Sequence, residues 1–476
     1  MAMAKEKIFC TIAYFMLVLF EMAVIQTYTL PELSLAIIFN ICVQIIILWI
    51  LRISLYSIGP VFILMGQLFQ FGIIILMSLK YDFSSFVLYY LDELEESEVL
   101  RAGEFSFLCV SFLFLGFLLG NKKQSQKVRK DRQLSLAFYK NAGIIMTIGF
   151  GTVWLFVQIV NLYLSRNGYE KNAYNTLPST IITLANFMYA GIFFLMVYYK
   201  KKKQMFWVNA WFIFALLLTV VSMLAGVRSM GMCIIVLLFI FYGLSIRKID
   251  GRLIICISIC GFFLLALLTA IMHLRSRPFS ISALMSEWVV CIKSNIIFNA
   301  VEEFGMSIFI LIYEMKAHMA GMFDFHYENI FLHELVVSIP GLPSLFPNLV
   351  GEGFIKLDLY GLGCSIYADV YYYLGNMSYL FFVFFGLYLS IIDNKLLLLS
   401  KREDYYGMAC RWIFYHLILS EIRSAFRLGY KAFLLSIFVM WFIRLVLGGK
   451  YKNEESVYLQ DTISNNNGYY YSNKEL

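Results

Sequence analysis

The sequence predicts an all-α, polytopic membrane protein, a bundle of about 12 transmembrane helices with one large loop outside the membrane. Of its 476 residues, 61% are hydrophobic and 14% are charged, whereas roughly 25% of the residues in a soluble domain are charged. The apolar residues form long runs separated by short polar segments. Because lipid offers no hydrogen-bond partners, each run must satisfy its own backbone groups, which favours helices.

Twelve runs are expected to span the membrane. In chain order they are Ile8–Ile25, Leu33–Leu51, Ile58–Leu79, Phe105–Gly120, Ile144–Leu164, Thr180–Tyr199, Phe206–Ala225, Gly231–Ile246, Leu253–Leu274, Tyr379–Ile392, Met408–Ser420 and Tyr430–Leu447. The tenth and eleventh runs are short, so we expect their helices to extend by a turn or two beyond these limits.

Lysine and arginine in short loops stay on the cytoplasmic side, so their distribution predicts the orientation. With the N-terminus inside, the inner loops receive the basic clusters 122–132, 200–203, 247–252 and 395–402. The loop 80–104, which falls on the outer side in this orientation, is acidic. Both termini are therefore predicted to be cytoplasmic. Anionic inner-leaflet lipids account for the net charge of +7, and no nucleic-acid partner is expected.

The runs divide the chain into four parts. Residues 1–274 form an N-terminal membrane part with nine spans, residues 275–378 a large outer loop, residues 379–453 a C-terminal membrane part with three spans, and residues 454–476 a disordered cytoplasmic tail. Within the loop, the short apolar segment Ile308–Tyr313 is interpreted as an amphipathic or partly re-entrant helix against the outer membrane surface.

Five arginines oppose the charge bias because they fall near the outer side: Arg228, Arg275, Arg277, Arg423 and Arg427. Arg228 lies in a short turn between two spans, and the four-residue spacing of Arg423 and Arg427 predicts one helix face. Arginine binds phosphate oxygens in pairs and keeps its charge, so the set predicts a diphosphate site at the membrane surface. For any single arginine, anchoring of a helix at the headgroups is the simpler explanation.

Carboxylates and histidines of the outer loop are candidates for proton transfer from a sugar hydroxyl. The acidic candidates are Glu302, Glu303, Glu314, Asp324, Glu328, Glu334, Asp358 and Asp369, and His326 is the candidate histidine. A metal site is not expected, because Val337 replaces the second histidine of a zinc-protease pattern that starts at His333. No phosphate-binding loop or dinucleotide fingerprint is present, so no cofactor is expected.

Short motifs in the outer segments resemble a known family. They are Gly168-Tyr169, Gly226-Val-Arg228-Ser, Glu303-Phe-Gly305 and Gly361-Leu-Gly-Cys-Ser365-Ile-Tyr-Ala-Asp369-Val-Tyr-Tyr-Tyr-Leu-Gly375. With the layout of the spans, the chain resembles the Wzy-type polymerases of O-antigen and capsule repeat units. Members often carry glutamate where Asp369 stands.

The resemblance implies a GT-C-like glycosyltransferase of the bacterial inner membrane. It would join oligosaccharide repeat units linked to undecaprenyl diphosphate at the periplasmic face, with a chain-length regulator protein as a further partner. Arg228, Glu303 and Asp369 match the family's pattern, whereas Arg275, Arg277, Arg423 and Arg427 rest on their chemistry. Two alternatives stay open, an O-antigen ligase and a lipid-linked oligosaccharide flippase, the latter being expected to carry charged residues within its spans and to have two comparable halves.

Overall fold

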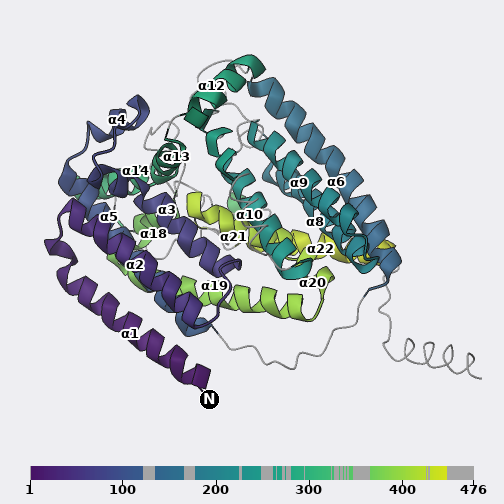
Figure 1. Cartoon of the computed structure of the whole chain (residues 1–476), viewed down its shortest axis with the longest axis horizontal. Coiled ribbons are helices and arrows are strands. Elements are labelled where there is room, and N and C mark those ends of the chain that lie inside the picture. The colour runs from purple at the N-terminus through teal and green to yellow at the C-terminus, as the bar shows by residue number, and fades with distance from the viewer. Residues whose placement is uncertain are drawn as a thin grey trace, which may run out of the picture.

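The computed structural model of the chain (Figure 1) describes residues 2–121, 134–165, 177–224, 228–247, 280–293, 295–322, 365–424 and 429–447, together with short pieces at 261–263, 265–267, 269–270, 274, 324–325, 332, 336, 339, 342–346 and 426. The regular secondary structure of these residues is helical. The expectation of an all-α fold is therefore confirmed.

The helices follow one another along the chain with these bounds. They are α1 (Ala2–Val24), η1 (Ile25–Thr27), α2 (Leu30–Ile50), α3 (Ile58–Ser78), α4 (Ser85–Leu91), α5 (Glu96–Gly120), α6 (Leu136–Ser165), α8 (Ser179–Lys201), α9 (Met205–Leu224), α10 (Arg228–Ser245), α12 (Ile281–Lys293), α13 (Ile296–Gly305), α14 (Ile308–Met319), α16 (Leu342–Leu345), α18 (Ile366–Leu374), η2 (Gly375–Met377), α19 (Ser378–Lys401), α20 (Tyr405–Ala409), α21 (Trp412–Ser420), η3 (Glu421–Arg423) and α22 (Tyr430–Val446).

In the described part of the chain, nine helical segments are long and apolar enough to cross a membrane. All but one coincide with predicted runs, and the exception, Ile296–Met319, lies in the segment predicted as a loop. The eighth and twelfth predicted runs appear as shorter apolar helices, Met230–Ser245 and Ala432–Val446. The eleventh is divided between α20 and α21, and most of the ninth, Leu253–Leu274, falls outside the described residues.

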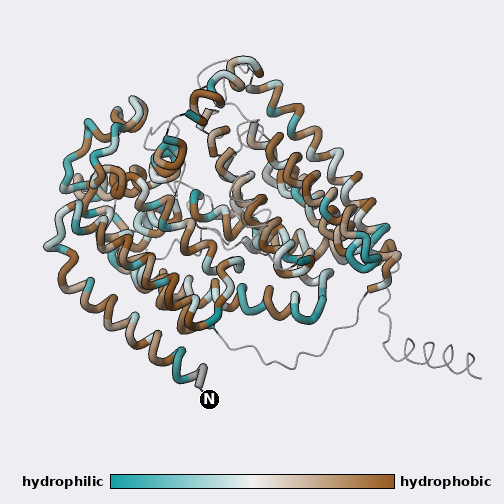
Figure 2. Tube along the Cα trace, viewed as in Figure 1, coloured by the Kyte–Doolittle hydropathy of each residue, from teal (hydrophilic) through white to brown (hydrophobic). Residues whose placement is uncertain are grey.

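One end of the bundle, which we call the basic face, gathers loops that are distant in sequence. Lys7 donates to the carbonyl of Leu119 (3.2 Å), Asn394 to that of Gly120 (3.3 Å), and Ser400 to that of Leu244 (2.7 Å). Lys200 donates to the Tyr405 hydroxyl (3.1 Å). These contacts bring the N-terminus and the basic ends of α8 and α19 to the same side, where Figure 2 shows hydrophilic helix ends.

The opposite end, the acidic face, holds the connection between α3 and α5 and both ends of α13–α14. The Tyr81 hydroxyl donates to Asn299 near the start of α13, and Lys316 near the end of α14 pairs with Glu98 (3.2 Å). Between these helices, the Ser307 hydroxyl reaches the carbonyl of Phe69, near the middle of α3. The α13–α14 hairpin therefore enters the bundle and returns to the face from which it started.

This hairpin corrects the interpretation of Ile308–Tyr313 in one respect. A re-entrant helix is present, but Ile308, Phe309, Leu311 and Ile312 are at most 1% exposed, so α14 lies inside the bundle and not on a membrane surface. Glycines allow the entry: a Cβ on Gly305 would lie 2.5 Å from the Ile73 nitrogen, and one on Gly72 would lie 2.4 Å from the Val301 carbonyl oxygen. Such close backbone approach is typical of membrane helix packing.

A second hairpin, α21–α22, starts from the basic face. Along it, Phe414 packs on Phe433 (5.4 Å between ring centroids), and Ser436 donates to the carbonyl of Cys410. Arg444, near the end of α22, lies over the ring of Tyr406. The two helices are thus antiparallel, and both outer ends lie at the basic face. Between them, the described residues Glu421–Ser424, Phe426 and Gly429 form a tip inside the bundle.

Candidate functional site

Three breaks in helical structure meet beside the middle of α3, at a place we call the central junction. The first is the α13–α14 connection, where Ser307 donates to the Phe69 carbonyl. The second is the start of α18, where Ser365 donates to the Gln70 side chain (3.3 Å). The third is the tip, whose Arg423 guanidinium lies 5.8 Å from the centroid of the Phe69 ring. Irregular backbone at such depth is tolerated where protein groups satisfy it, and such places are frequently binding sites.

Asp369 connects two of these breaks. It lies in the first turn of α18 and is 3% exposed. Its Oδ2 accepts a hydrogen bond from the backbone nitrogen of Phe426 in the tip (2.9 Å). The Phe426 ring is buried and packs against Phe381 and Phe385 of α19, with centroids 5.0 and 5.9 Å apart. Asp369 therefore holds the tip that carries Arg423.

Two further carboxylates are buried close by. Glu303 on α13 is 2% exposed and precedes Phe304, whose ring packs against that of Phe69 at 5.0 Å. Glu314 on α14 is 1% exposed, interacts electrostatically with Asp369, and has no hydrogen-bond partner for its Oε2 among the described residues. Burying a carboxylate costs several kcal/mol unless it is compensated, so such residues in a membrane bundle point to function.

Glu302, the neighbour of Glu303, has a different position. It accepts hydrogen bonds from the backbone nitrogen (3.0 Å) and hydroxyl of Ser84, which caps α4. Burial, with the nearby carboxylates of Glu302 and Asp82 adding to it, raises the pKa of the Tyr81 hydroxyl, which keeps its proton and donates to Asn299. Glu302 thus holds the connection between α3 and α5 at the acidic face and is not part of the central junction.

The structure corrects the predicted position of Arg423. It is the last residue of η3, and Ser424 is extended (φ −146°, ψ 171°), so the helix ends at Arg423. Arg423 also lies against Phe69 at mid-depth and not near an outer helix end. The reason is the length of α21, which ends at Ser420 after starting from the basic face.

Of the other arginines and the histidine predicted for the site, only the backbone of Arg228 lies in the described part of the chain. Arg228 is the first residue of α10, so the predicted turn already contains the start of a helix, but its side chain is not described. Arg275, Arg277, His326 and Arg427 lie outside the described residues. Within the described part of the chain, no three His, Cys, Asp or Glu side chains are grouped to hold a metal ion.

Sequence reasoning missed His416. This residue of α21 is 1% exposed, its ring is hydrogen-bonded to the backbone of Met230, and its Nε2 has no partner among the described residues. Met230 lies two residues after Arg228, so His416 connects the α21–α22 hairpin to the start of α10. The available signal was an ionisable residue within an apolar run, which marks a functional candidate by default.

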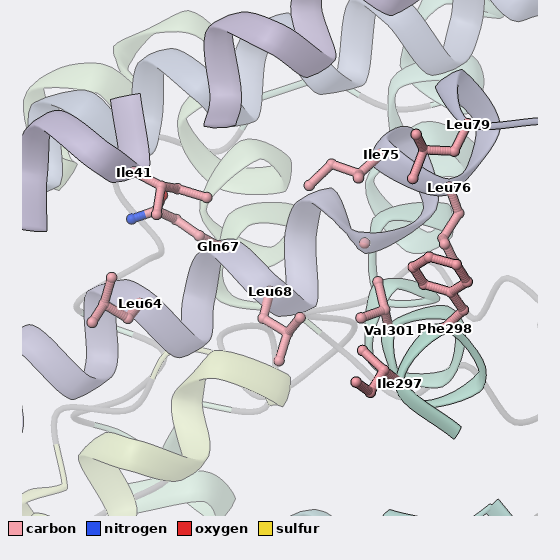
Figure 3. A pocket seen from close by; sticks show the side chains of 11 residues that line it. Ile41, Leu64, Gln67, Leu68, Ile75, Leu76, Leu79, Ile297, Phe298 and Val301 are labelled. Carbon is pink, nitrogen blue, oxygen red and sulfur yellow. The ribbon is translucent and has the colours of Figure 1, made fainter. Parts of the chain in front are cut away.

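An apolar groove runs along α3 beside the junction (Figure 3). It has a volume of about 210 Å³ and is lined by Ile41 of α2, by Leu64, Gln67, Leu68, Gly72, Ile75, Leu76 and Leu79 from α3 and its end, and by Ile297, Phe298 and Val301 of α13. Leu68 and Ile297 are 37% and 59% exposed. The groove is thus open to the apolar surroundings of the bundle, and its lining residue Gly72 also approaches Gly305, next to the turn of the α13–α14 hairpin.

The fold and the junction define a polytopic helical membrane protein with a buried polar site built from re-entrant hairpins. A family model described as O-antigen polysaccharide polymerase Wzy matches residues 7–352. The chain belongs to this family. The match includes Arg228 and Glu303 but ends before α18, so Asp369 and Arg423 lie beyond it. No curated protein and no solved structure matches the chain.

Proposed function

We propose that this protein is a glycosyltransferase of the bacterial inner membrane that polymerises O-antigen repeat units carried on undecaprenyl diphosphate, working at the periplasmic face with both termini in the cytoplasm. Membership of the Wzy family carries the proposal. Its chemistry is supported by the central junction, where an arginine and buried carboxylates meet without any nucleotide-binding motif. A donor that arrives as a lipid diphosphate is already activated, so cationic stabilisation of the leaving group is the main requirement.

Arg423 is the described cation suited to that leaving group. Its guanidinium carbon lies over the Phe69 ring, 5.8 Å from the centroid, and a guanidinium offers five N–H donors in the geometry of phosphate oxygens. Arg228, Arg275, Arg277 and Arg427 are proposed as further diphosphate ligands. Glu303 is the proposed base for the acceptor hydroxyl because it is a buried carboxylate next in the chain to Phe304, whose ring packs on Phe69 at the junction, and His326 stays a second candidate.

Asp369 is proposed here as a positioning residue in place of the catalytic role expected from the sequence. Its Oδ2 is engaged with the Phe426 nitrogen, which an irregular loop inside a membrane must satisfy. The hydrogen bond places the tip, and with it Arg423, against α3. The groove beside α3 (Figure 3) is proposed to receive the part of the isoprenoid chain next to the diphosphate, since its lining is almost wholly apolar.

A flippase would share the diphosphate-binding arginine. Buried acidic residues, the feature expected of a flippase, do occur inside the bundle, since Glu314 and Asp393 lie within apolar helices. Asp393 lies near Ser57 at the start of α3, at the basic face, whereas Glu314 belongs to the junction. A ligase uses the same donor and differs in its acceptor, so the two enzymes are separated by their products.

Deleting the gene tests the function. A polymerase defect should leave single repeat units on the lipid A core, because supply and ligation of one unit continue, and the wild-type gene on a plasmid should restore long chains. Loss of even the single units would point to a flippase or a ligase and contradict the proposal. Gel separation of the surface polysaccharide reads out all three outcomes.

A further inference from the structure

A second groove lies between α19 and the α21–α22 hairpin, near the basic face. It has a volume of about 270 Å³ and is lined by Tyr388, Ile391, Ile392, Lys395, Arg411, Phe414, Tyr415 and Phe433. The α19 residues Tyr388, Ile391, Ile392 and Lys395 follow a helical spacing, so they form one stripe that ends in a cation. This groove is separate from the central junction and from the groove along α3.

Neither Lys395 nor Arg411 makes an ion pair with an acidic side chain in the described part of the chain, although the Asp393 carboxyl lies near Tyr415. Lys395 is exposed and makes no ion pair with a described residue. Arg411 donates from Nη1 to the Gly407 carbonyl (2.8 Å), and no other described residue accepts a hydrogen bond from it. Tyr415, which also lines the groove, is 1% exposed, and its hydroxyl has no hydrogen-bond partner among the described residues.

The apolar part of the groove opens toward the bilayer. Ile391 is 63% exposed, and Leu434, which follows the lining residue Phe433, is 65% exposed. Rings of Tyr388, Phe414 and Phe433 form its floor, with centroids 6.4 and 5.4 Å apart. Cations at one end and exposed apolar walls along the rest match a molecule with an anionic head and a hydrocarbon chain.

We propose that this groove binds an anionic phospholipid of the leaflet at the basic face, with its phosphate between Lys395 and Arg411 and one acyl chain along Ile391 and Phe433. Basic pockets between helices on this side of a membrane bind anionic headgroups, and each basic residue contributes about 1 kcal/mol. The lipid would fill the space beside the hairpin whose tip carries Arg423. The proposal concerns binding alone and stands whether or not the protein is a polymerase.

The test uses the purified full chain in nanodiscs of phosphatidylcholine with increasing phosphatidylglycerol, and lipids that stay bound after transfer to detergent are counted by native mass spectrometry. Wild type should retain phosphatidylglycerol in preference to phosphatidylcholine. Lys395→Gln or Arg411→Gln should each reduce this preference about fivefold, the equivalent of one such contact. Ile391→Trp should reduce retention of the lipid without a change of charge, because the larger side chain fills the groove.

Lys401→Gln is the matched control, since Lys401 is exposed on the same helix and does not line the groove. It should retain phosphatidylglycerol like wild type. Equal retention by the Lys395→Gln, Arg411→Gln and Ile391→Trp proteins would overturn the proposal, as would equal retention of the two lipids by wild type. If one variant fails to fold, the other two still decide the outcome.

Discussion

The two hairpins that meet at the central junction are held in different ways. The α13–α14 hairpin enters from the acidic face by direct backbone contact, with Gly305 against Gly72 and Ile73, and it carries carboxylates. The α21–α22 hairpin enters from the basic face, is held at its tip by the Asp369 side chain and the Phe426 ring, and carries the arginine. Direct backbone contact fixes the position of the α13–α14 turn, whereas the position of a tip held by side chains can be changed by a single substitution.

The largest expected effect is an all-or-none difference in maleimide labelling, which reports the topology of the α13–α14 hairpin. If α13–α14 is a hairpin, cysteines introduced as Asn295→Cys and Met322→Cys should both react with a membrane-impermeant maleimide added to spheroplasts. Lys401→Cys should react only after permeabilisation. These three positions are exposed, and the wild-type protein provides the background from its native cysteines. Labelling of only one of the first two positions would show that Ile296–Met319 crosses the membrane once. The α13–α14 segment would then not be a hairpin to compare with α21–α22.

The next largest effect concerns backbone packing. Gly305→Ala should destabilise the protein by about 3 kcal/mol, the upper part of the range for overpacking, because the added methyl meets backbone atoms that cannot move aside. Gly149→Ala is the control, since a Cβ there has no atom within 4 Å. Thermal unfolding in detergent measures both. Similar melting temperatures for the two variants would mean that the hairpin is not held by this contact.

Arg423→Lys should reduce polymerisation ten- to a hundredfold while the protein accumulates normally. Lysine keeps the charge but loses the planar donors, and a charge-assisted pair contributes about 1.5 to 3 kcal/mol. Arg444→Lys is the matched control, because Arg444 covers a ring at 5.7 Å much as Arg423 does at 5.8 Å, but at the basic face. The length of the surface polysaccharide on gels measures the result. Polysaccharide of wild-type length from the Arg423→Lys protein would mean that this arginine only anchors its helix. We expect Arg228→Lys to shorten the chains as well.

The smallest effect distinguishes positioning from catalysis at Asp369. Asp369→Asn keeps an oxygen that accepts the Phe426 N–H, so it should retain most activity, whereas Asp369→Ala should lose about 1 to 3 kcal/mol of tip stabilisation. The position of the tip is read independently by the maleimide labelling rate of Ser424→Cys, which should rise in the Ala variant only. An inactive Asn variant with unchanged labelling would make Asp369 a catalytic residue.

The sequence by itself determined that the chain is a helical membrane protein, because apolar runs with satisfied backbones permit little else in lipid. It also determined the segregation of basic loops, and its motifs indicated the Wzy family that the family model confirms. Glu303 was named from such a motif, and in the structure it is buried and precedes Phe304, whose ring packs against that of Phe69.

Only the tertiary structure decided how deep each residue lies. Ile296–Met319 is apolar enough to cross the membrane, and only the contacts of Asn299, Ser307 and Lys316 show that it turns back. The same holds for Asp369, whose partner lies 57 residues away in the tip. Hydropathy reports the solvent that a segment prefers, whereas the direction of a helix and the partner of a buried charge depend on packing between segments that are distant in the chain.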